Sequence, residues 1–389
     1  MKQLKNIFRT LFLLLAILGG ISSPAFAEDN QSLGNIEIGL ITCSPHEEIY
    51  SLYGHTALRY HDLNTGQDLV FNYGVFNFDQ PFFVLRFVFG LTDYELGILP
   101  YRFFCQYYEE WGSQVTEHVL QLSDNEKMAI AEALAINYRP ENRTYRYNFF
   151  YDNCSTRPRD IIEKNIHGKI NYASRQNTDK SFRELIHEYN KHHPWAAFGN
   201  DLLLGVKADN TASQRQQEFL PLYLMEDFDN ATVDRNGNIS NLVKERRVLV
   251  PHGVQTIESD FPLTPTQCAV LLLIITVLIT CYDWKRKRLS VWYDVILMAT
   301  TGLLGCVLFI MIFSQHPTTS INLQILLLNP CSLIFIPQII RKKKTIWFHI
   351  NLICILLFFI GGIWQDYAEG MELVALSLLL RIWKHYNEK

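Results

Sequence analysis

The sequence is poor in charge and contains no recognisable metal-binding motif. Only 19% of its 389 residues are charged, and the formal net charge is −4. A chain of this composition has no basic field that would hold nucleic acid. Its eight cysteines include no CxxC pair and no cysteine–histidine spacing typical of zinc, so we expect neither a metal nor another cofactor. Internal repeats and low-complexity tracts are also missing from the sequence.

The first 27 residues have the pattern of an export signal. Three basic residues precede the apolar stretch Leu11–Leu18, and Ala25-Phe26-Ala27 provides the small residues of a cleavage site. The alternative is an uncleaved anchor helix, which Pro24 and the short apolar stretch disfavour. We therefore predict a signal peptide over residues 1–27 and export of the chain that follows.

Apolar residues are divided unequally between two halves of the chain. Residues 28–262 have the aromatic-rich composition of a water-soluble domain, whereas residues 263–389 are apolar stretches separated by short basic clusters. The candidate membrane helices are the stretches at about 264–282, 291–313, 323–340, 346–364 and 372–383. The clusters Lys285–Arg288 and Arg341–Lys344 lie in alternate loops, which the positive-inside rule assigns to the cytoplasm. The sequence thus predicts a periplasmic domain followed by an α-helical bundle of about five helices, multi-pass in the inner membrane of a Gram-negative-type bacterium.

The predicted periplasmic domain mixes strands with helices, so its fold class is α+β. Period-two alternation indicates strands, and a capping box at Ser123–Glu126 opens a helix. We expect strands at Ile36–Cys43, His55–Asp62 and Asp68–Val75, helices at Ser123 to about Tyr138, Thr156–Asn165, Ser181–Lys191 and Ala212–Leu220, and a hairpin around Asn236-Gly237. Pro221 is expected to end the last of these helices.

Two short segments contain the residue types of a cysteine-nucleophile site. Gly54 allows a sharp turn before His55 opens a strand, and Cys154 precedes a helix. The positive end of a helix and a nearby imidazole both favour the thiolate form of a cysteine. A third polar side chain usually orients the imidazole. Asn72 and Tyr73, on the neighbouring strand, are the two candidates for that role.

Each of these residues has a simpler interpretation when it is taken alone. A lone cysteine is more often a small buried side chain, and a histidine at a strand end is often structural. Outside the apolar half the chain has only Cys43, Cys105 and Cys154, so one thiol stays free if two of them pair. A Cys43–Cys105 disulfide is one option in an oxidising periplasm. Taken with the helix start and the order of the elements, this odd number favours catalysis by Cys154.

This order of histidine strand, polar strand and cysteine helix resembles the circularly permuted papain-like fold of the NlpC and lecithin retinol acyltransferase groups. The chain is more similar to the Lnb family of bacterial lipoprotein N-acyltransferases. The similarity rests on the segments Ile41–Pro45, Tyr53–Arg59, Phe71–Gly74, Asp152–Arg157 and His316–Pro330. The loop Ser320–Gln324 departs from the family, in which an Asn-Trp-Asn-like run is expected.

The resemblance implies a membrane-bound acyltransferase. Cys154 would carry an acyl thioester taken from a phospholipid, and His55 would act as general base and then as general acid. Asn72 or Tyr73 would orient His55. The acceptor would be the N-terminal amine of a lipoprotein. The alternatives are a periplasmic NlpC-type peptidase or amidase that acts on peptidoglycan, and a non-enzymatic membrane assembly factor.

Four further residues are candidates for substrate binding. Arg59 and Arg157 lie close in sequence to the proposed pair, where each could hold a lipid phosphate bidentately or form an ordinary salt bridge. Asn153 adjoins the nucleophile, and His316 lies in a predicted periplasmic loop that could form the floor of the site. The phenylalanine-rich stretch 76–90 is either an ordinary core segment or an apolar surface for lipid.

Overall fold

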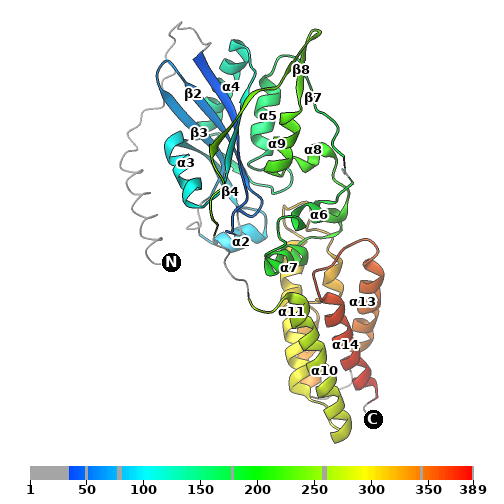
Figure 1. Ribbon diagram of the computed structural model, residues 1–389. Helices are drawn as coiled ribbons and strands as arrows, with labels where there is room; N and C mark the ends of the chain where they lie inside the picture. Colours follow the sequence, from blue (N-terminus) through cyan, green and yellow to red (C-terminus); the bar gives the residue numbers. More distant parts are fainter. Residues whose placement is uncertain are drawn as a thin grey trace. The chain divides into compact units, whose positions relative to one another are not determined.

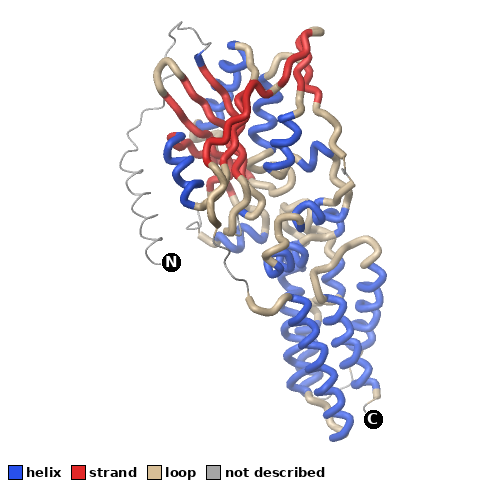
Figure 2. Tube along the Cα trace, in the orientation of Figure 1, coloured by secondary structure: helices blue, strands red, loops and turns tan. Residues whose placement is uncertain are grey.

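The computed structural model describes residues 35–48, 51–76, 81–176, 179–255, 261–341 and 345–387. The predicted signal peptide lies outside these residues. Residues from Ile36 onward form one compact unit. Strands are confined to its first part, and after Val250 the described residues contain only helices and loops (Figure 2).

A seven-stranded antiparallel sheet is the centre of the first part (Figure 1). Its strands are β1 (Ile36–Cys43), β2 (His55–Asp62), β3 (Gln67–Val75), β4 (Asp93–Pro100), β5 (Val115–Leu120), β6 (Thr144–Arg146) and β10 (Val243–Val250). They are ordered β10-β5-β1-β2-β3-β4-β6. The three strands predicted from alternation are confirmed as β1, β2 and β3. Cys43 pairs with His55 in the β1–β2 ladder, which places both side chains on the same face of the sheet.

Helices cover both faces of this sheet (Figure 1). On one face α3 (Tyr101–Glu110) buries Phe104 and Tyr108 against β3, β4 and β10. On the other face lie α4 (Asp124–Tyr138), α5 (Thr156–Asn165) and α9 (Pro221–Asp229). The predicted capping box at Ser123 and Glu126 is present at the start of α4, and α5 has the predicted bounds.

The region between α5 and α9 departs from the predicted helices. The helix expected over Ser181–Lys191 is limited to α6 (Phe182–His187), and the one over Ala212–Leu220 to α8 (Gln214–Gln217). Pro221 was expected to end a helix but instead begins α9 as its first residue, where its missing N–H costs no hydrogen bond. The remaining elements here are β7 (Lys169–Asn171), α7 (Pro194–Leu203), η3 (Val206–Asp209), β8 (Thr232–Arg235) and β9 (Asn238–Asn241). The predicted hairpin is confirmed as β8–β9.

The second part is helical, but its third predicted helix is broken. Its elements are α10 (Pro265–Arg286), α11 (Val291–Met311), η4 (Leu323–Leu326), α12 (Ser332–Ile340), α13 (Trp347–Gly361) and α14 (Met371–Tyr386). In the described residues α10 and α11 are long and apolar enough to cross a membrane, and α13 is a shorter apolar helix. A continuous helix over 323–340 is wrong, because Pro330 has no N–H and the Asn329 side chain instead accepts the N–H of Cys331.

Buried side chains of the helical part bind backbone carbonyls at the C-terminal end of α7. The Gln324 side chain donates to the carbonyl of Asp201 at 2.8 Å, and Gln365 donates to the carbonyl of Leu204 at 3.1 Å. Asn322 donates to the carbonyl of Leu202 at 2.8 Å. The loop Ser320–Gln324 is therefore part of the contact between α7 and the helical part.

Candidate functional site

Cys154 lies two residues before the first residue of α5, in a turn that Asn153 fixes. The Asn153 side-chain oxygen accepts the N–H groups of Ser155 and Thr156 at 2.9 and 3.0 Å. Its amide group donates to the carbonyls of Phe149 and Phe219, both at 2.8 Å. Asn153 is buried and fully engaged in these bonds, so the structure shows a residue that shapes the turn and not the predicted substrate contact.

His55 reaches the site from the first position of β2. Gly54 precedes it with φ +77°, and a Cβ at Gly54 would lie 2.7 Å from the carbonyl oxygen of Cys43. Only glycine adopts this turn without strain. The hydroxyls of Thr56 and Ser155 are 2.9 Å apart and join β2 to the start of α5. These contacts bring His55 and Cys154 together, and the two side chains are hydrogen-bonded.

The residue that orients His55 is Asn72. Its side-chain oxygen lies 2.5 Å from Nε2 of His55. Because an amide oxygen only accepts, Nε2 carries a proton and Nδ1 is left for the thiol. Tyr73 is the next residue on β3, so its side chain points to the opposite face, where it packs against Tyr145. The structure therefore distinguishes the two sequence candidates, and Tyr73 makes no contact of this kind with His55.

The pKa values of Cys154 and His55 are shifted in opposite directions. Burial opposes ionisation of the Cys154 thiol, but the positive charge of His55 and its hydrogen bond outweigh burial and lower the pKa of Cys154. The backbone N–H groups of Thr56 and Cys154 act in the same direction. Burial likewise disfavours the His55 imidazolium, but the Cys154 thiolate and the hydrogen bonds to Cys154 and Asn72 raise the pKa of His55. Both shifts favour the thiolate–imidazolium form of the pair over the neutral one.

Aromatic side chains from β4, β6 and the turn before Cys154 surround the thiol. The rings of Tyr94 and Tyr147 are stacked with their centroids 4.1 Å apart. Burial raises the pKa of Tyr94 to about 12, with the thiolate charge of Cys154 as a further cause. The same two causes raise the pKa of Tyr145 and Tyr147. The sequence analysis missed Tyr94, which is brought to the site by the pairing of β4 with β6.

The two arginines expected to hold phosphate are engaged in ion pairs. Arg59 is buried, donates to Asp68 at 2.7 Å and to Glu117 at 3.0 Å, and stacks on the ring of Tyr101. This is the salt-bridge alternative, and the structure offers no support for a phosphate contact by Arg59. Arg157 pairs with Asp152 at 2.6 Å, and its guanidinium lies 3.5 Å from the centre of the Tyr145 ring.

His316 belongs to a loop that contacts the segment after α2 (Phe83–Val88). The neighbouring Gln315 donates its N–H to the carbonyl of Phe89 at 2.9 Å and accepts from Arg146 at 3.2 Å. A Cβ at Gly90 would lie 3.1 Å from the backbone nitrogen of His316. Through Gln315 this loop is bonded to Arg146 of β6, and through Thr318 it is bonded to the N–H of Gly205.

The other thiols outside the helical part are reduced and unpaired in this structure. Burial raises the pKa of Cys43 well above its usual value, and also raises that of Cys105. Among the described residues, no group of three or more His, Cys, Asp and Glu side chains could hold a metal ion. The chemistry of the site rests on one activated thiolate, an adjacent imidazolium and the amide that orients it, an arrangement suited to acyl transfer.

Family models match the chain in two adjacent regions. The model of the Lnb N-terminal periplasmic domain matches residues 23–188, and that of the Lnb transmembrane domain matches residues 256–389. No curated protein and no solved structure matches the chain. The first region includes His55, Asn72, Cys154 and the strands β1 to β6 of the sheet, and the second includes the helices from α10 onward. The chain therefore belongs to the Lnb family of membrane proteins, with a periplasmic domain followed by a transmembrane domain.

Proposed function

We propose that this protein is an inner-membrane acyltransferase that moves an acyl chain from a phospholipid to the N-terminal amine of a lipoprotein. The observation that carries the proposal is the Cys154–His55–Asn72 arrangement, in which the imidazole lowers the pKa of the thiol. An activated thiolate of this kind attacks ester carbonyls. The transmembrane domain supports a substrate that resides in the bilayer.

In the first step the Cys154 thiolate attacks the carbonyl carbon of a phospholipid ester. The tetrahedral intermediate collapses to a thioester, and the C–O bond to the glycerol breaks. His55 gives its proton to the leaving alkoxide, which departs as a lysophospholipid. The backbone N–H groups of Thr56 and Cys154, which donate to the sulfur in the resting site, are the nearest donors for the developing oxyanion.

In the second step the α-amine of the lipoprotein's diacylglyceryl cysteine attacks the thioester carbonyl. His55, now neutral, takes the proton that the amine loses. The C–S bond breaks, an amide forms, and Cys154 leaves as the thiolate. The resting thiolate–imidazolium pair is restored, so the cycle needs no cofactor. Asn72 holds the same Nε2–H throughout and keeps Nδ1 directed at the reacting atoms.

The surroundings of the thiol support a lipid donor over a peptide. Tyr94, Tyr145 and Tyr147 lie close enough to Cys154 to be affected by its charge, and such an aromatic environment suits an acyl chain better than a polar peptidoglycan strand. Arg146 follows Tyr145 in β6 and is bonded to Gln315, which comes shortly after α11. The strand edge that supplies these rings is thus attached to the transmembrane domain.

The test is to incubate the purified full-length protein with phospholipid and no acceptor. We expect an acyl adduct on Cys154 that neutral hydroxylamine removes, and its absence in Cys154→Ala. In cells that lack the protein, mass spectrometry of lipoprotein N-terminal peptides should show the loss of one acyl chain. An NlpC-type peptidase would form no lipid adduct, and an assembly factor would keep its cellular activity in Cys154→Ser. Either result would end the acyltransferase proposal.

A further inference from the structure

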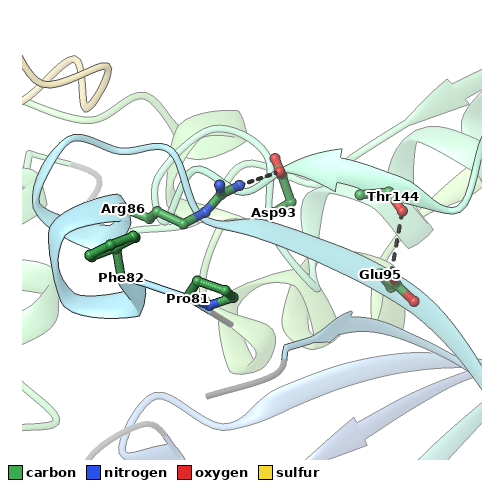
Figure 3. A pocket seen from close by; sticks show the side chains of 6 residues that line it. All are labelled: Pro81, Phe82, Arg86, Asp93, Glu95 and Thr144. Carbon is green, nitrogen blue, oxygen red and sulfur yellow. Dashed lines mark hydrogen bonds and ion pairs between the residues drawn. The ribbon is translucent and has the colours of Figure 1, made fainter. Parts of the chain in front are cut away.

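A pocket of about 400 Å³ lies at the β4–β6 edge, next to the first residues of α2 (Figure 3). It is lined by Pro81, Phe82, Arg86, Asp93, Glu95 and Thr144. Arg86 points toward Asp93 across the pocket, and Thr144 toward Glu95 (Figure 3). None of these residues belongs to the Cys154 site, and Pro81, Phe82 and Arg86 lie in the phenylalanine-rich stretch 76–90 noted in the sequence.

The charges around this pocket leave a positive excess. Asp93 is shared by two guanidinium groups, those of Arg86 and Arg146, each at 2.9 Å. Glu95 pairs with Arg143 at 3.7 Å. Three cationic and two anionic side chains therefore meet here. The Nε group of Arg86 is buried and has no hydrogen-bond partner among the described residues, so Asp93 does not satisfy this guanidinium completely.

The pocket adjoins both exposed apolar side chains and the transmembrane domain. Phe82 is 77% exposed and Leu85 is 53% exposed, although both are large apolar residues. Arg146 bonds the side chain of Gln315, and Gln315 in turn bonds the carbonyl of Phe89. Exposed aromatic residues beside cationic ones, next to a membrane helix, are typical of the lipid–water interface.

We propose that this pocket binds the phosphate of a bilayer phospholipid, with Arg86 and Arg146 as its cationic groups and Phe82 and Leu85 in contact with the bilayer. Guanidinium groups bind phosphate through paired hydrogen bonds, and a phosphate would replace part of what Asp93 now supplies. The inference deepens the proposed function, because the phospholipid held here is the acyl donor. It also assigns phosphate binding to residues other than Arg59 and Arg157.

The location of the pocket relative to Cys154 fits a donor site. Tyr94 lies between Asp93 and Glu95 on β4, and its side chain points to the opposite face, where it is affected by the thiolate charge. Two residues that line the pocket, Asp93 and Glu95, thus alternate along β4 with Tyr94, which is affected by the Cys154 charge. A lipid bound by its phosphate at this edge would have its ester groups near the aromatic side chains around Cys154.

The competing interpretation is a structural clamp, in which the two arginines only tie α2 and β6 to Asp93. Three variants of the full-length protein, assayed in mixed micelles, distinguish a phosphate site from a structural clamp. They are Arg86→Gln, Arg146→Gln and Asp93→Asn. The rate of thioester formation is measured against the concentration of dioleoylphosphatidylethanolamine. We expect KM to rise about tenfold in each arginine variant, as loss of a charged hydrogen bond predicts. In Asp93→Asn, KM should fall, because both guanidinium groups are released for phosphate.

A structural clamp predicts that KM rises in all three variants, because replacing Asp93 or either arginine would weaken the same ion pairs. That result would overturn the proposal. Arg102→Gln is the control, because it removes a positive charge at an exposed position of α3 that takes no part in the pocket, and its KM should stay unchanged. A p-nitrophenyl acyl ester, which has no phosphate, should acylate all variants at the wild-type rate. Equal losses with this ester would also contradict a phosphate site.

A readout without catalysis keeps this inference separate from the proposed function. Native mass spectrometry of the purified full chain should show retained phospholipid in wild type and Asp93→Asn, and less in Arg86→Gln and Arg146→Gln. Added glycerophosphate, which has the phosphate without the acyl chains, should not displace the lipid. Retention without any thioester would reject the acyltransferase and leave the lipid site standing. Equal retention in all variants would reject the lipid site.

Discussion

Cys43 and Cys154 are two thiols beside the same histidine, and they have opposite properties. Cys43 pairs with His55 across β1 and β2 and is completely buried, and burial raises its pKa well above the usual value. Cys154 is also enclosed, but the charge and hydrogen bond of His55 lower its pKa. The difference is the direction of the imidazole, which Asn72 sets. Reactivity at this site is therefore a matter of orientation as well as proximity.

The opposite pKa shifts of the pair predict how its reactivity varies with pH. A lowered pKa of Cys154 keeps the thiolate populated as the pH falls below about 8.5, the usual value for a thiol. A raised pKa of His55 keeps the imidazolium populated as the pH rises above about 6.5. Both shifts favour the thiolate–imidazolium pair, so below about pH 8.5 iodoacetamide should alkylate Cys154 faster than it alkylates an ordinary thiol. In His55→Ala the reaction should need a higher pH, and an unchanged profile in that variant would contradict the pairing.

Asn72 and Tyr73 provide a second test at the residue scale. Asn72→Ala should lower acyl transfer by about 10- to 100-fold, because His55 loses the bond that fixes its tautomer and direction. Tyr73→Phe is the matched control: it keeps the ring that packs against Tyr145 and should leave the rate nearly unchanged. Both are measured as thioester formation on Cys154, with unfolding followed in parallel. A larger loss in Tyr73→Phe than in Asn72→Ala would contradict the geometry.

Sequence patterns identified the candidate reactive residues, but they did not predict the contacts that the neighbouring residues make. The helix start and the strand order pointed to Cys154 and His55. Adjacent residues on a strand face opposite sides, so a register uncertain by one residue cannot separate Asn72 from Tyr73. The sequence could not decide whether Arg59 binds a phosphate or forms a salt bridge, because its partner Glu117 comes from β5, far along the chain. Such a contact follows from sheet order, which no local pattern contains.

Elements with strong local signals were predicted well, and those set by tertiary contacts were not. Strands β1 to β3 and the capped helix α4 agree with the sequence, because alternation and capping act within a few residues. The broken helix at 323–340 was hidden by its continuous apolar composition. A Cβ at Gly305 would lie 2.2 Å from the carbonyl of Leu328, so the non-helical segment is packed directly on α11.

The turn before β2 gives a prediction at the scale of elements. Gly54→Ala should destabilise the protein by roughly 1–3 kcal/mol, because the new Cβ meets the carbonyl of Cys43 in a strained backbone conformation. It should also slow alkylation of Cys154, since the turn places His55. Gly66→Ala is the control: Gly66 has a similar φ of +73°, but nothing lies within 4 Å of the added Cβ. It should cost some stability and leave the alkylation rate unchanged, and equal rates in the two variants would count against this role of the turn.

At the scale of the whole molecule, the transmembrane domain is bonded to the segment that supports the His55 turn. Tyr53 accepts a hydrogen bond from Asn200 at 2.7 Å, close to His55 in the chain. The next residue, Asp201, has its carbonyl held by Gln324. A Cβ at Gly205 would lie 2.0 Å from the carbonyl of Ile321, so the backbones also approach closely. Buried polar contacts of this kind require a fixed geometry, because each unpaired group would be costly.

The last prediction follows from this contact. Gln324→Met should remove the bonds to the carbonyl of Asp201 and to the N–H of Ala368 while keeping a side chain of similar size. If the contact sets the position of the catalytic domain over the bilayer, thioester formation from vesicle phospholipid should fall about tenfold, as expected when a reacting group is misplaced. Alkylation by soluble iodoacetamide and acylation by a short-chain, water-soluble phospholipid should keep wild-type rates, since neither depends on the bilayer. Gln106→Met, on the exposed surface of α3, is the matched control and should match wild type in all three assays. Equal losses with both donors would instead mean that Gln324 supports the fold of the site itself.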